Sequence, residues 1–140
     1  MRTTLRSTLA LALLLGLSLP AFAVDSKDTE ASPQAKVYRA SQKAIAAGDA
    51  DAYAKTMTAE ANKQMVAQAK EMGKTPKDLM ELMKIMSPAD VKLSDLKVNG
   101  KKATMTGIGS MDKEQMKGTI ELEEEGGQWK IRTQSWTNTK

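Results

Sequence analysis

The chain has 140 residues, a formal net charge of +4, ten methionines, and neither cysteine nor histidine. The missing cysteine and histidine exclude disulfide bonds, cysteine–histidine zinc sites and nucleophilic mechanisms that depend on a Cys or His side chain. The length suits one ordinary domain that buries its own hydrophobic core.

The first 23 residues, Met1–Ala23, have the pattern of a secretory signal peptide. Arg2 and Arg6 give a positive start, an apolar stretch follows, and Ala21-Phe22-Ala23 has the small-x-small pattern of a cleavage site. The apolar stretch is too short for a membrane span. We therefore expect cleavage after Ala23, a periplasmic or secreted protein, and no membrane span once the signal is removed.

Signal cleavage also changes the charge of the chain. Arg2 and Arg6 leave with the signal, so 21 Lys+Arg become 19 against 17 Asp+Glu, and the formal net charge falls from +4 to +2. The remaining basic residues are mostly lysines, and no aromatic residues interleave with them to stack on bases. Nucleic acid is therefore not expected as a partner.

The mature chain begins with residues 24–31, which are short, charged and without periodicity, and which predict a flexible leader. A single domain over residues 32–138 follows. Ser32-Pro33 is a helix-start signal, and hydrophobic periodicity predicts four helices that each follow a capping residue. Their predicted bounds are 33–47, 50–57, 59–72 and 76–86.

After Asp90 the hydrophobic period changes from helical to two, which predicts strands. The predicted strands are 91–98, 102–110, 116–124 and 128–137. Asn99-Gly100 is a strong hairpin signal, and Gly126-Gly127 turns the chain before the last strand. The sequence thus predicts an α+β fold in which N-terminal helices pack on one apolar face of a four-stranded antiparallel sheet.

The methionines raise the question of a metal site, because Met80, Met83 and Met86 have a spacing that suits thioether binding of copper(I). At helical spacing, Met83 and Met86 lie beside Leu79 and Leu82 on the apolar face, with Met80 at its edge. Core packing therefore explains two of the three, and methionine fills irregular gaps well. The third helix has a similar stripe of Ala61, Met65, Ala69 and Met72. No cofactor is predicted, and copper(I) binding stays an alternative.

The order of these elements and three short phrases resemble small exported members of the NTF2-like (cystatin-like) superfamily, many of them domains of unknown function. The phrases are Ala47-Gly48-Asp49-Ala50-Asp51-Ala52, Lys102-Ala103-Thr104-Met105 and Gly126-Gly127-Gln128-Trp129-Lys130-Ile131. The resemblance covers about residues 33–137. It implies a curved sheet wrapped around the first helix, forming a cone whose open end holds a small molecule. In enzymatic relatives that cone contains an acid or base.

Four residues are the candidates for the lining of such a cone: Tyr38, Tyr53, Met105 and Trp129. The two tyrosines lie on the inner faces of the first two helices, and Trp129 is the largest apolar side chain of inward parity on the last strand. Packing in the core, without a ligand, is the alternative for each of the three. Trp136 has the opposite parity, which leaves both a sheet edge and the open surface as places for it. No Asp or Glu has an inward position on the predicted strands, so no catalytic residue is predicted.

The sequence therefore predicts an exported, non-enzymatic binding or accessory domain for a small apolar ligand or an envelope protein partner. A cone enzyme that uses Tyr and Asp in acid–base chemistry is an alternative, as is copper(I) binding. A homodimer through the exposed sheet face is also compatible with the pattern. A cone filled by side chains would favour a scaffold or protein-binding role, and an open pocket with an inward carboxylate would favour catalysis.

Overall fold

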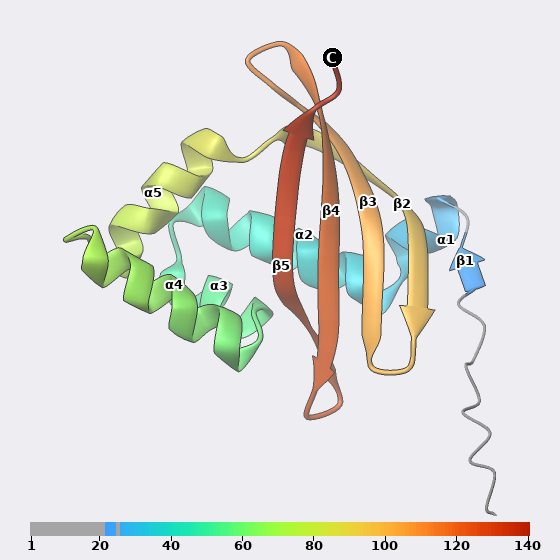
Figure 1. Cartoon of the computed structure of the whole chain (residues 1–140), viewed down its shortest axis with the longest axis horizontal. Coiled ribbons are helices and arrows are strands. Elements are labelled where there is room, and N and C mark those ends of the chain that lie inside the picture. The colour runs from blue at the N-terminus through green and yellow to red at the C-terminus, as the bar shows by residue number, and fades with distance from the viewer. Residues whose placement is uncertain (1–21, 25) are drawn as a thin grey trace, which may run out of the picture.

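The structure, a computed structural model, describes residues 22–24 and 26–140. The predicted signal peptide, Met1–Ala23, lies outside the described residues except for its last two positions. The described chain forms helices followed by an antiparallel sheet, so the predicted α+β class is confirmed (Figure 1).

The helices and long strands lie close to their predicted bounds. The helices are α1 (Ser26–Ala31), α2 (Pro33–Ala47), α3 (Ala50–Thr56), α4 (Ala59–Glu71) and α5 (Pro76–Met86). The strands are β1 (Phe22–Val24), β2 (Ala89–Asn99), β3 (Lys102–Met111), β4 (Glu114–Glu125) and β5 (Gln128–Asn138). The four predicted helices and four predicted strands all end within two residues of the predicted positions, and α1 and β1 are additions.

Local capping fixes where the four predicted helices begin. The side chains of Ser32, Asp49, Thr58 and Thr75 each accept a hydrogen bond from the backbone N–H three residues later. Asp78 completes the last of these caps, since its carboxylate accepts from the Thr75 N–H at 2.8 Å. Hydrogen bonds from the Thr75 backbone and side chain lower the pKa of Asp78 below its ordinary value.

The predicted flexible leader is wrong for residues 26–31, which form α1. Glu30 on α1 pairs with Arg39 on α2 at 2.5 Å and accepts a hydrogen bond from the Leu93 N–H at 3.1 Å. Arg39 in turn donates to the Val91 carbonyl at 2.8 Å. These bonds hold α1 against α2 and β2, and local periodicity does not reveal them because the partners lie far along the chain.

The sheet has the order β1-β2-β3-β4-β5, and every neighbouring pair is antiparallel. Helix α2 crosses one face of the sheet, whereas α3, α4 and α5 lie beyond the β5 edge (Figure 1). A bridge between Met57 and Ile131 joins the end of α3 to β5. The helices therefore cover one face of the sheet and lie beside one of its edges.

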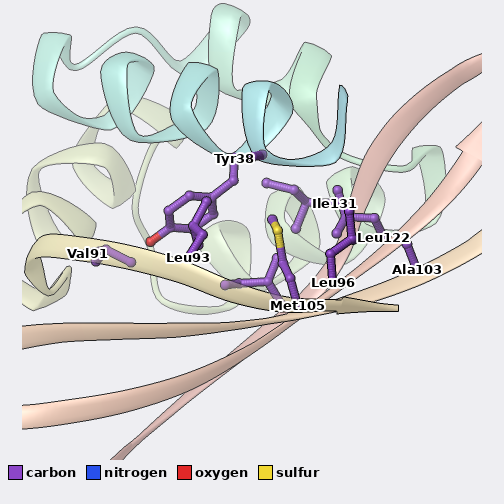
Figure 2. Close-up of a cluster of buried hydrophobic side chains, with 10 residues drawn as sticks. Tyr38, Val91, Leu93, Leu96, Ala103, Met105, Leu122 and Ile131 are labelled. Carbon is purple, nitrogen blue, oxygen red and sulfur yellow. The ribbon is translucent and has the colours of Figure 1, made fainter. Parts of the chain in front are cut away.

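Two clusters of buried side chains form the core. The first, the α2–sheet cluster, fills the space between α2 and the sheet, and Figure 2 shows Tyr38 projecting from α2 toward Leu93 and Met105. Its buried members are Ala35, Tyr38, Val91, Leu93, Leu96, Ala103, Met105, Ile120, Leu122 and Ile131. The second, the helical cluster, consists of Ala44, Ile45, Tyr53 and Met80, with Met57, Met65 and Met83 packed partly buried against it.

The predicted burial of the α5 methionines is wrong for Met80 and Met86. Met80, expected at the edge of the apolar face, is fully buried, whereas Met86 is 63% exposed. Met72, expected in the stripe of the preceding helix, is also exposed. Met80 is buried because it packs with Ile45 and Tyr53 in the helical cluster.

Strict alternation along β5 from Trp129 and Ile131 would place Trp136 on the opposite face of the sheet. Trp136 nevertheless lies on the same face as these two residues. Glu121 pairs with Thr133 while its neighbour Leu122 pairs with Ile131, so β5 contains one extra residue at this level. Such a bulge reverses the alternation beyond it. Trp136 consequently packs against the α2–sheet cluster.

Two glycines make room for the Trp136 indole. A Cβ atom at Gly118 would lie 2.6 Å from the Trp136 ring, and one at Gly107 would lie 2.7 Å from it.

Candidate functional site

The structure brings three of the four predicted pocket residues to one cluster, because Trp129 packs, partly buried, against the α2–sheet cluster that contains Tyr38 and Met105. Tyr38 and Met105 are fully buried in the α2–sheet cluster, and Tyr53 belongs to the helical cluster. Trp129 is half-buried and lines a cavity at the surface. The space between α2 and the sheet holds the side chains of the α2–sheet cluster (Figure 2).

The Tyr38 phenol does not ionise at neutral pH. Burial raises the pKa of its phenol to about 12, against a smaller opposing effect of the Arg39 guanidinium. That guanidinium lies 5.8 Å from the centre of the Tyr38 ring. The hydroxyl has no hydrogen-bond partner among the described residues. Tyr38 thus acts as an apolar filler, and its phenol stays protonated.

Tyr53 takes part in a polar link between the helices and β5. Burial raises the pKa of Tyr53, and a side-chain hydrogen bond with Gln134 offsets part of that rise. The Trp136 indole N–H also donates to the Gln134 side-chain oxygen, at 3.4 Å. Gln134 therefore connects the helical cluster to the sheet, which gives Tyr53 a structural role.

The cavity that Trp129 lines, the Trp129 cavity, has a volume of about 410 Å³. It lies between the first half of α2, the end of α3 and the start of β5. Its lining residues are Pro33, Lys36, Val37, Ala40, Lys55, Thr56, Gly127, Gln128, Trp129 and Lys130. Gly126 and Gly127 both have positive φ and form the tight turn that brings Trp129 back toward α2.

The charges around this cavity all have one sign. Lys36, Lys55 and Lys130 line it, and its described lining contains no Asp or Glu. The Lys130 ammonium donates to the Lys55 carbonyl at the end of α3, which holds this lysine at the cavity. The cavity therefore offers an apolar wall beside three cations, an arrangement that suits an apolar molecule with an acidic group.

The methionine candidates for copper(I) differ in burial, although Met83 packs against the helical cluster that contains Met80. Met83 and Met86 line one surface hollow with Trp136, whereas Met80 is fully buried in the helical cluster. Among the described residues there is also no group of three Asp or Glu side chains placed to hold a metal ion.

Sequence reasoning identified Trp129 and missed the three lysines that surround it. Trp129 is identifiable from its size and its strand parity. Lys36, Lys55 and Lys130 lie on three separate elements, so no local spacing indicates that they meet. The fold alone brings them together.

Comparisons with known proteins assign the chain to no family. No protein-family model matches the chain, and no curated protein matches it. In the part of the chain that the structure describes, no helix has the length and apolar character needed to cross a membrane. The resemblance to the NTF2-like superfamily thus stays a prediction.

Proposed function

We propose that the protein is an exported, non-enzymatic binding domain of NTF2-like architecture that holds a small apolar ligand with an acidic group in the Trp129 cavity. The observation that carries this proposal is the apolar cavity wall bordered by three lysines and, among its described lining residues, by no carboxylate. Export rests on the predicted signal peptide.

The apolar wall supplies most of the binding free energy in this proposal. Burying roughly 150 Å² of ligand surface against Trp129 and Val37 contributes about 4 kcal/mol before the entropic cost of association. An exposed lysine–carboxylate pair adds about 0.2 to 1 kcal/mol. The apolar part of the ligand therefore sets the affinity, and the lysines select for an acidic head group.

The same geometry favours binding over catalysis. General acid–base chemistry needs a group whose pKa lies near the working pH and which reaches the substrate. The Trp129 cavity presents lysines and an indole, and burial holds the pKa of Tyr38 at about 12 inside the filled core. The alternative of a Tyr/Asp cone enzyme receives no supporting observation from these residues.

Fluorescence of the single remaining indole tests the proposal. The chain has two tryptophans, so a Trp136→Phe background leaves Trp129 as the reporter. Titration with decanoate, decanol and decyltrimethylammonium compares three head groups on one apolar chain. We expect a saturable change in Trp129 emission, with decanoate binding tightest and the cationic amphiphile weakest.

Matched double variants separate the cavity lysines from the general charge of the protein. Lys36→Gln with Lys55→Gln should weaken decanoate binding by about three- to tenfold, because two weak ion pairs are lost. Lys63→Gln with Lys117→Gln removes the same charge from exposed positions outside the cavity and should leave binding unchanged. Equal affinity for all three amphiphiles, or equal losses in the two double variants, would contradict the proposal.

A further inference from the structure

Three hollows lie side by side between β5 and the helices α4 and α5. Their volumes are about 520, 280 and 300 Å³. The first two share Arg132 and Thr133, and the second and third share Met83 and Gln134. They are therefore neighbours along β5, and we name the three together the β5 groove. It shares no lining residue with the Trp129 cavity.

The β5 groove follows the edge of the sheet. β5 is the last strand in the sheet order, so it pairs with β4 on one side only. Near its start the chain already uses the other side, since Met57 forms a parallel bridge with Ile131 and the Thr58 N–H donates to the Ile131 carbonyl at 2.9 Å. Among the described residues no strand continues this pairing toward Asn138. Open backbone groups of an edge strand pair readily with an extended chain.

Flexible apolar side chains form one wall of the groove. Met65 comes from α4, Met83 and Met86 come from α5, and Trp136 comes from β5. Unbranched thioether side chains adapt to apolar groups of different shapes, which suits a surface that receives peptide side chains. Met86 is 63% exposed, so part of this wall lies open.

The other end of the groove is acidic. Glu60, Glu123 and Glu125 line it; Glu125 already accepts the Ala59 N–H at 3.1 Å, and the one basic side chain among the described lining residues there, Arg132, pairs with Glu121. This end therefore suits a basic residue.

We propose that the β5 groove binds an extended segment of another polypeptide as an added strand on β5. The segment has apolar side chains at alternate positions, which enter the methionine-lined part, and a basic residue at the acidic end. A polypeptide is the occupant because the edge of β5 offers backbone hydrogen bonds and the methionine wall offers places for side chains. The chain itself makes this kind of contact at Met57 and Thr58.

Selection of short random peptides displayed on phage, followed by binding measurements with the synthesised winners, tests the inference. We expect enriched peptides with alternating apolar residues and a basic end. Their binding should slow hydrogen exchange at backbone amides of residues 133–138, because these amides lie on the strand that gains a partner.

Two neighbouring exposed residues on α5 give a matched pair of variants. Met86 lines the groove, whereas Ile85 is 77% exposed and does not line it, so neither substitution removes a core side chain. Met86→Lys should weaken peptide binding about tenfold, the loss expected when one contact of about 1.4 kcal/mol is removed. Ile85→Lys should leave the affinity unchanged within about twofold.

Several results would overturn the inference. They are a selection that enriches no peptide, equal affinities for the two lysine variants, and slowed exchange away from β5. A homodimer that Met86→Lys dissociates would show that a second copy of the chain occupies the groove, which also contradicts a foreign polypeptide.

Discussion

The α2–sheet cluster and the helical cluster both have almost completely buried centres, but different partly buried side chains border them. Tyr38, Leu93 and Met105 are buried almost completely between α2 and the sheet. Around the helical cluster, Met65 and Met83 are partly exposed and border the β5 groove. Val37 and Trp129 at the border of the first cluster line the Trp129 cavity, whereas Met65 and Met83 at the border of the second line the β5 groove.

The difference arises from the elements that form each cluster. Four long strands present alternate side chains at close spacing, and α2 covers them with a continuous apolar face. On α4 the buried residues are Ala61 and Ala69, whose small side chains fill little volume. Helix α4 therefore covers the β5 edge without sealing it.

The largest expected effect comes from a truncation in the α2–sheet cluster, compared with one at the border of the β5 groove. Leu93→Ala should lower the free energy of unfolding by about 2 to 5 kcal/mol, because it leaves a cavity in a filled cluster. Met86→Ala should change it by less than about 0.5 kcal/mol, because Met86 is mostly exposed. Urea denaturation followed by circular dichroism measures both. Similar losses would remove the contrast between the two regions.

A smaller effect is expected where Trp136 covers Gly118. Gly118→Ala places a methyl group 2.6 Å from the indole and should cost about 1 to 3 kcal/mol through overpacking. Trp136→Ala removes the obstructing ring, so the cost of Gly118→Ala should largely disappear in the double variant. Denaturation of the four proteins in this cycle gives the coupling energy. Additive losses would show that the indole does not lie on Gly118.

The smallest effect at neutral pH is expected from Tyr38→Phe. The hydroxyl is buried without a partner among the described residues, so its removal should change stability by less than about 0.5 kcal/mol. Above pH 10 the free energies of unfolding of the parent protein and of Tyr38→Phe should diverge. Burial raises the pKa of Tyr38 from 10.0 to about 12, so the unfolded chain loses this proton first and stability falls as the pH rises between these values.

Comparison with Tyr53→Phe sharpens this test. Tyr53 has a hydrogen bond with Gln134, so its hydroxyl should matter more at neutral pH, by about 1 kcal/mol. Denaturant unfolding at pH 7 and at several values above 10 measures both variants. A Tyr38→Phe protein that keeps the alkaline loss of the parent would show that Tyr38 is not the group responsible.

Local signals predicted most of the fold. Helix starts at Ser32, Asp49, Thr58 and Thr75 depend on side chains within three residues, which a sequence shows directly. The exceptions depend on distant partners or on irregular backbone. Helix α1 is held by contacts to β2, and the extra residue in β5 changes the side of Trp136 without a composition signal.

The candidate site was less predictable than the fold. Trp129 was identified because a large apolar residue of inward parity must either fill a core or border a cavity. Its lysine neighbours come from α2, α3 and β5, and only the three-dimensional structure shows that they converge. Tyr38 and Met105 were assigned to a ligand cone, but the structure places them where other side chains already fill the space.

A decanoate titration followed by amide chemical shifts tests the central claim, that the ligand binds at the surface beside a sealed core. The account predicts saturable shifts at Lys36, Lys55 and Lys130, around the indole of Trp129, with Met105 unchanged. Saturable shifts centred on Met105 and its strand neighbours, with none at the three lysines, would contradict it.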